Sequence, residues 1–168
     1  MATLRKKICL LGSDGVGKTS IILRFTKNTF SESYLTTLGC DFYEMAFQKG
    51  DDRLEVFYWD IASQKNFQKM RAHYLTNSHF VIVCIDIHRT EANYIEPWID
   101  EIRTHIGENV PFILALNKID LTQPGKYEKL IAKLEDTYKK QVIAVSAKTG
   151  ENIHMLFETV SDELLSSH

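Results

Sequence analysis

Apolar residues follow two patterns along this chain: short continuous runs of strand length, and longer stretches in which they recur every three or four positions. The runs predict strands near residues 5–11, 39–48, 53–60, 79–85, 110–116 and 141–145. The longer stretches predict helices near residues 17–26, 65–76, 91–106, 125–139 and 152–165. Alternation of this kind is typical of α/β proteins. We therefore expect one domain over residues 1–168, with a six-stranded, mostly parallel sheet and about five helices on its two faces.

Two local features modify this expectation. Lys49-Gly50-Asp51-Asp52 joins the second and third predicted strands, and so short a turn suits a hairpin. One edge strand is therefore predicted to run antiparallel. Pro97 falls inside the third predicted helix, where we expect a late start or a kink, because proline removes a helical hydrogen bond.

Residues 12–19 read Gly-Ser-Asp-Gly-Val-Gly-Lys-Thr and lie between a predicted strand and a predicted helix. This spacing is that of a phosphate-binding P-loop, whose glycines let successive N–H groups turn toward phosphate oxygens at a helix N-terminus. Lys18 can reach the β- and γ-phosphates, and the Thr19 hydroxyl can bind Mg²⁺. The alternative is a glycine-rich turn with an exposed lysine. The predicted phosphate-binding residues are Gly12, Asp14, Gly15, Val16, Gly17, Lys18, Thr19 and Ser20.

Two later segments point to guanine as the base. Asn117-Lys118-Ile119-Asp120 follows a continuous apolar run. Asp120 can accept hydrogen bonds from the N1–H and exocyclic amine of guanine, which adenine does not offer, while Asn117 can bind N7 and Lys118 can cover the ring. Ser146-Ala147-Lys148 follows the last predicted strand and would offer the Ala147 amide to guanine O6 and the Lys148 stem to the ring.

The phosphate and base signals lie at corresponding places in the predicted sheet. Gly12, Asp60, Asn117 and Ser146 each follow a predicted strand. Since ligands of open α/β sheets bind beyond the carboxyl ends of the strands, we expect all four signals to meet in one crevice.

The amino-acid composition limits the kinds of partner that we expect. The 168 residues carry a formal net charge of −2, which argues against nucleic acid or an anionic membrane as a default partner. Cys9, Cys40 and Cys84 lack metal-ligand spacing and are expected to be reduced thiols in a cytoplasmic protein. No signal peptide, membrane span, N-terminal glycine or C-terminal cysteine is recognised, so no lipid anchor is expected in the chain as given.

Two further segments carry a family resemblance. Residues 30–42, Phe-Ser-Glu-Ser-Tyr-Leu-Thr-Thr-Leu-Gly-Cys-Asp-Phe, resemble the first switch of Rab proteins. Residues 59–64, Trp-Asp-Ile-Ala-Ser-Gln, resemble their second switch, which usually reads Trp-Asp-Thr-Ala-Gly-Gln. Over essentially its whole length the chain is similar to small GTPases of the Ras superfamily, and most similar to the Rab branch.

The resemblance implies roles for residues in both switches. Thr37 would bind Mg²⁺ and the γ-phosphate of GTP, and Asp60 would hold Mg²⁺ through water. Gln64 would orient the attacking water, so that Lys18, Thr37 and Gln64 form the catalytic set and Thr19, Thr37 and Asp60 form the metal set. Phe30, Tyr34 and Ser63 would also contact the nucleotide.

The same resemblance implies partners. Phe42, Trp59 and Tyr74 match an aromatic trio through which Rab proteins contact effectors, although each could instead be a core or sheet-face aromatic. Exchange factors and GTPase-activating proteins would act on the switch segments. Membrane contact, on the cytosolic face of endomembranes, is expected only if the native chain has a prenylated tail.

Asp14 and Ser63 depart from the family pattern. The Asp14 position, nearest the γ-phosphate, usually holds a small uncharged residue; a carboxylate there would repel a phosphate oxygen by up to roughly 4 kcal/mol, unless it rotates into solvent. Ser63 replaces a glycine, which costs on the order of 1 kcal/mol if a positive φ is required.

Two functions therefore remain open. The first is a Rab-like GTPase switch in vesicular traffic, which Gln64, Thr37 and Asp60 favour and whose hydrolysis Asp14 and Ser63 would slow. The second is a GTP-loaded interaction module with little or no hydrolysis, as Asp14 and Ser63 favour. A P-loop kinase is disfavoured, because an arginine-rich lid insertion is missing and guanine determinants are present.

Overall fold

The computed structural model describes residues 3–32 and 36–167. Within these residues a sheet of six strands has the order β2-β3-β1-β4-β5-β6. Only β2 runs antiparallel, against β3, and the remaining pairs are parallel. The predicted mostly parallel sheet with one antiparallel edge is therefore confirmed. The strands are β1 (Thr3–Leu11), β2 (Cys40–Lys49), β3 (Asp52–Ile61), β4 (Phe80–Asp86), β5 (Phe112–Asn117) and β6 (Val142–Ala144).

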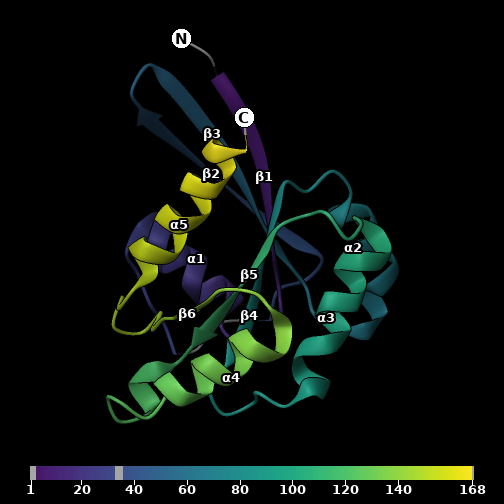
Figure 1. The fold of residues 1–168 in the computed structure, drawn as a ribbon. Coiled ribbons are helices and arrows are strands. Elements are labelled where there is room, and N and C mark those ends of the chain that lie inside the picture. Colours follow the sequence, from purple (N-terminus) through teal and green to yellow (C-terminus); the bar gives the residue numbers. More distant parts are fainter. Residues whose placement is uncertain (1–2, 33–35, 168) are drawn as a thin grey trace.

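Five α-helices cover the two faces of this sheet in the described chain (Figure 1). Alternate residues of β1 point to opposite faces: Ile8 and Leu10 pack with the core under α1 and α5, and Cys9 and Leu11 pack with the core under α2, α3 and α4. The helix predicted near 65–76 is divided into a 3-10 turn at Lys65–Phe67 and then α2. The helices are α1 (Lys18–Lys27), α2 (Gln68–Leu75), α3 (Ala92–His105), α4 (Glu128–Tyr138) and α5 (Ile153–Ser166).

Aromatic side chains fill much of the core beneath α1 and α5. Phe25 of α1 stacks on Phe157 of α5 with ring centroids 3.9 Å apart, and Tyr58 of β3 meets Phe157 edge-on at 5.2 Å. On both faces the central strand β4 is buried throughout, as expected of a parallel strand covered by helices on two sides. This packing holds the strand ends in fixed positions.

The two local expectations have different outcomes. Lys49 pairs with Asp52 at the end of the β2–β3 hairpin, as predicted. Of the two alternatives expected at Pro97, the late helix start is wrong, because α3 begins at Ala92 and continues through the proline; the kink stays a prediction. Pro97 is exposed, so the carbonyl that lacks a helical N–H partner can be hydrated instead. Among the described helices, none is long and apolar enough to cross a membrane.

Parallel pairing brings the carboxyl ends of the strands to one edge. β1 lies between β3 and β4, with Leu10 beside Asp60 and Leu11 beside Val83. β4 in turn pairs with β5 so that Asp86 lies opposite Asn117. The loops that follow β1, β3, β4, β5 and β6 therefore meet at this edge, where the sequence motifs lie.

Candidate functional site

The P-loop turns from β1 into α1 in direct contact with the loop after β5. Asn117 Nδ2 donates a hydrogen bond to the Val16 carbonyl at 2.9 Å. Gly17 has φ +98°, and a Cβ there would collide with the Asn117 side-chain amide. The close approach of these two loops therefore requires glycine at position 17, both for its backbone conformation and for space.

Lys18 is buried at the base of the P-loop. Its Nζ donates to the Gly12 carbonyl at 2.8 Å and lies 3.4 Å from the Ser13 carbonyl. Burial lowers the pKa of Lys18, while the Asp60 carboxylate acts in the opposite direction. The ammonium group is thus held at the cavity by backbone oxygens and can donate to a phosphate oxygen there.

Thr19, Thr37 and Asp60 lie together, although they come from α1, the segment before β2, and β3. The Thr19 and Thr37 hydroxyls are 3.0 Å apart, and Asp60 Oδ2 accepts a hydrogen bond from Thr19. Asp60 Oδ1 is buried and has no hydrogen-bond partner among the described residues. Burial raises the pKa of Asp60. One carboxylate, two hydroxyls and the phosphates of a bound nucleotide form a donor set that suits Mg²⁺.

At the opposite end of the site, Asp120, Ser146 and Asn117 form a linked polar group. Ser146 Oγ donates to Asp120 Oδ1 at 2.6 Å, which orients the carboxylate. The Ala147 N–H donates to Asn117 Oδ1 at 3.1 Å. The sequence interpretation assigned the Ala147 N–H to guanine O6. In the structure this N–H already donates to Asn117, so a bound guanine would have to share it.

A cavity of about 470 Å³ connects the phosphate and base ends, a size typical of small-molecule sites. Most of the predicted site residues line it. They are Asp14, Gly15, Gly17, Lys18, Thr19, Ser20, Phe30, Thr37, Ser63, Gln64, Asn117, Lys118, Asp120, Ala147 and Lys148.

Five predicted residues do not form the described cavity wall. Gly12, Val16, Asp60 and Ser146 are buried behind it, where they support the lining residues. Tyr34 lies outside the described residues.

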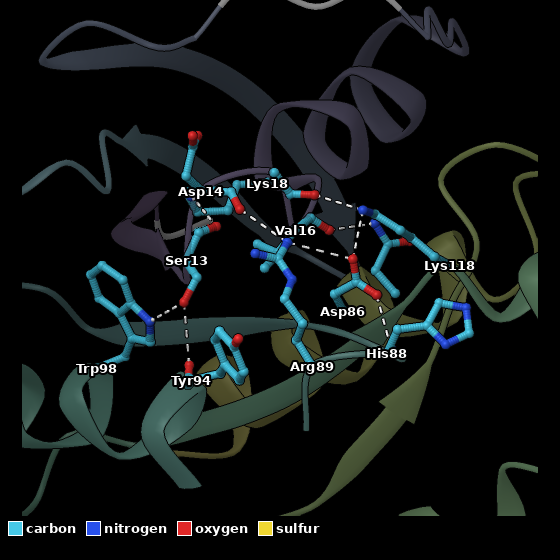
Figure 2. Close-up of polar contacts among 12 residues, drawn as sticks. Ser13, Asp14, Val16, Lys18, Asp86, His88, Arg89, Tyr94, Trp98 and Lys118 are labelled. Carbon is cyan, nitrogen blue, oxygen red and sulfur yellow. Dashed lines mark hydrogen bonds and ion pairs between the residues drawn. The ribbon is translucent and has the colours of Figure 1, made fainter. Parts of the chain in front are cut away.

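Sequence reasoning did not identify Arg89, which binds the outer side of the P-loop directly, or Asp86, which is connected to the P-loop through Lys118 and Arg89 (Figure 2). Asp86 Oδ2 accepts from Lys118 Nζ at 2.7 Å, and Lys118 Nζ also donates to the Gly15 carbonyl at 2.7 Å. Arg89 Nη2 donates to the Asp14 carbonyl at 3.0 Å and lies 3.5 Å from Asp86 Oδ2. Asp86 ends β4 as Asn117 ends β5, so the strand-end rule could have identified it.

Asp14 and Ser63, the two residues that depart from the family pattern, differ in their surroundings. Asp14 is exposed, and its carboxylate points away from Arg89 (Figure 2). Arg89 therefore holds the Asp14 backbone without pairing with its side chain. Ser63 is half-buried and is not among the residues with positive φ. The expected strain at Ser63 is therefore absent in this conformation.

A comparison with protein-family models matches residues 7–166 to the Ras family. The match includes the P-loop, both switch-like segments and both base-binding segments, and the observed sheet is that of a small G domain. The chain therefore belongs to the Ras family, whose members are small GTPases that bind GTP and GDP with Mg²⁺ and act as switches read by effector, exchange and activating proteins.

Proposed function

We propose that this protein is a Rab-like small GTPase, a switch in vesicular traffic whose GTP hydrolysis is slow. The observation that carries the proposal of slow hydrolysis is the Asp14 carboxylate. It lines the cavity at the P-loop, and Arg89 binds its backbone carbonyl instead of its side chain. A negative group beside the phosphates opposes the accumulation of charge in phosphoryl transfer.

The site residues have four roles. Lys18 neutralises the β- and γ-phosphates, while Thr19, Thr37 and Asp60 hold Mg²⁺, which when bound offsets the negative charge of the phosphates. Gln64 orients the attacking water. Guanine is bound by Asn117, Asp120 and Ala147 between the stems of Lys118 and Lys148, and Phe30 packs at its edge.

Slow hydrolysis follows from charge at the P-loop. Loss of about 1.4 kcal/mol of transition-state stabilisation is enough for a tenfold slower reaction. Burial is the largest influence on Lys18 and lowers its pKa, while Asp60 and, more weakly, Asp14 act in the opposite direction. A carboxylate at position 14 is therefore within electrostatic reach of the phosphate-binding ammonium. Ser63 adds restriction only if the loop must take a positive φ in another nucleotide state.

The partner surface of this switch comprises Phe42, Trp59 and Tyr74. Phe42 is 61% exposed, and its ring meets Trp59 edge-on with centroids 4.6 Å apart. Trp59 and Tyr74 are 6.0 Å apart. Trp59 and Tyr74 are half-buried against the core, so Phe42 is the exposed member of the trio. Aromatic side chains are enriched at protein-binding surfaces, so we assign effector contact to this trio, with Phe42 as its most accessible ring. We place the protein in the cytoplasm, and on endomembranes only if a lipidated tail is present.

A second function is favoured by the same Asp14 carboxylate. If it abolishes hydrolysis, the protein is a GTP-loaded interaction module, and the aromatic trio alone provides its output. Both hypotheses require guanine-nucleotide binding, and they differ in the rate of GTP conversion.

Reversion of both unusual residues tests the proposal. The variant Asp14→Ser with Ser63→Gly should raise the single-turnover rate of GTP hydrolysis at least several-fold, roughly 1 kcal/mol in the barrier. The single variants Asp14→Ser and Ser63→Gly show how much each residue slows hydrolysis. The dissociation rate of fluorescent GDP shows whether nucleotide binding is intact. An unchanged hydrolysis rate in a double variant that still binds GDP would contradict the proposed cause of slow hydrolysis.

A further inference from the structure

Arg71 of α2 is buried to 3% exposure and uses its guanidinium in two directions. Toward α3, its Nε and Nη2 donate to the two carboxylate oxygens of Glu101, at 2.9 and 2.8 Å. Toward the loop after β3, its Nη1 donates to the carbonyls of Ala62 and Gln64, at 3.1 and 2.8 Å. A buried arginine needs this degree of pairing, because unpaired charge is costly away from water.

The same guanidinium lies over the ring of Trp98, 5.2 Å from its centroid. Trp98 Nε1 donates to Ser13 Oγ at 3.2 Å, and Ser13 Oγ lies 3.5 Å from the Tyr94 carbonyl (Figure 2). One face of α3 therefore supports both the P-loop, through Ser13, and the loop after β3, through Arg71.

The contact with Ala62 sets the direction of a neighbouring N–H group. In a planar trans peptide the C=O and N–H point to opposite sides. Since the Ala62 carbonyl points to Arg71, the N–H of Ser63 points away from it. The Ala62 N–H is also fixed, because it donates to the Gly39 carbonyl at 2.9 Å. Ser63 and Gln64 both line the cavity.

Arg71 restrains Gln64 through its backbone carbonyl. The side-chain Oε1 of Gln64, in contrast, is buried and has no hydrogen-bond partner among the described residues. A buried amide oxygen without a partner is uncommon. It suits a side chain that is held in place for a ligand.

We propose that Arg71, held by Glu101 and Trp98, is a positioning residue for GTP: it orients the Ser63 N–H toward the third phosphate and places Gln64 for hydrolysis. The inference rests on the proposed function, since it assigns the phosphate end of the same cavity. Arg71 is buried and is not among the residues that line the cavity, so it acts through the backbone of residues 62–64.

The test combines Arg71→Met with Glu101→Gln, which removes the buried acid's charge together with the guanidinium. Three rates are measured: single-turnover hydrolysis of bound GTP, dissociation of fluorescent GDP, and dissociation of a non-hydrolysable GTP analogue. We expect hydrolysis to fall about tenfold or more, and the affinity for the analogue to fall at least about threefold relative to GDP. GDP dissociation should change less than about twofold, because GDP has no third phosphate to contact Ser63.

Arg103→Met is the matched control. Arg103 is on α3 and, among the described residues, forms an ion pair with exposed Asp100, at 3.6 Å, so its loss should leave all rates unchanged. Glu101→Gln alone keeps an acceptor for Arg71 and should have an intermediate effect. In a Gln64→Leu background, the Arg71 change should cause little additional loss of hydrolysis.

The outcomes distinguish the role of Arg71 from the proposed slow hydrolysis. A folded double variant with an unchanged analogue-to-GDP affinity ratio and unchanged hydrolysis would overturn the inference, and so would equal weakening of both nucleotides. If the wild-type protein hydrolyses no GTP, the proposed slow hydrolysis is wrong, and the affinity ratio still decides the role of Arg71.

Discussion

Burial controls the chemistry of the cysteine thiols at the scale of single residues. Cys9 and Cys84 lie inside β1 and β4 and are fully enclosed. Burial raises the pKa of Cys9 to about 11 and that of Cys84 to about 12. Both thiols are therefore protonated at neutral pH and poorly nucleophilic.

These shifts predict a loss of stability in alkali. Above about pH 8.5 an unfolded Cys9 loses its proton, while the folded thiol keeps it until about pH 11. Unfolding then releases a proton, so the free energy of unfolding falls as pH rises through this window, by about 3 kcal/mol for Cys9. Urea unfolding between pH 8 and 11, a range set by these pKa values, measures this loss of stability. The wild type is compared with Cys9→Ala. Equal pH slopes in the two proteins would contradict the assignment.

Residues in contiguous motifs were predictable, and residues that meet only in the fold were not. Lys18, Thr19 and Asp120 belong to motifs with fixed spacing, and each lines the predicted cavity. Arg71 and Glu101 are 30 positions apart, on two different helices, α2 and α3. Their pairing depends on how α2 packs against α3, which periodicity does not specify.

Helix α3 is the element that departs most from local sequence preference. Proline in a helix interior is about 3 kcal/mol less favourable than alanine, yet α3 continues through Pro97. Ile95, Trp98, Ile99 and Ile102 bury one face of the helix against the sheet. Tertiary packing of this face outweighs the local cost, which is why α3 does not start late, the first of the two alternatives expected at Pro97.

Replacement of this proline should therefore stabilise the protein. Pro97→Ala restores a helical hydrogen bond on an exposed surface, and we expect the free energy of unfolding to rise by about 1–2 kcal/mol. Thermal or urea unfolding measures the change, and Glu96→Ala serves as a neighbouring exposed control. Reduced stability would show that Pro97 is accommodated at no cost in α3.

The element boundaries agree closely with the sequence pattern, because the strands are apolar and separated by polar turns. Each observed strand begins and ends within three residues of its predicted range. The region after Gln64 agrees least, since a 3-10 turn precedes α2 there. Arg71 binds the carbonyls of Ala62 and Gln64 just before this turn. Local helix propensity does not predict such a contact.

At the scale of the whole molecule, the candidate metal site joins three parts of the fold. Thr19 opens α1, Thr37 precedes β2 and Asp60 lies near the end of β3. A bound nucleotide and its Mg²⁺ would connect these segments, and loss of the ion would release them together.

Removal of the metal should therefore loosen the nucleotide. We expect EDTA to accelerate dissociation of fluorescent GDP by at least about tenfold, or roughly 1.4 kcal/mol of binding free energy. In Asp60→Asn the basal dissociation should already be faster and the response to EDTA smaller, because the buried carboxylate is lost. Dissociation from wild type that is insensitive to EDTA would exclude a role for the ion in holding GDP.

The most direct test of the account is the fate of GTP on the purified wild-type protein. Chromatography of the bound nucleotide, followed by single-turnover conversion with Mg²⁺, measures binding and hydrolysis in one preparation. We predict bound guanine nucleotide and slow but measurable conversion of GTP to GDP. Rapid conversion would contradict the effect assigned to Asp14, and failure to bind any guanine nucleotide would contradict the account as a whole.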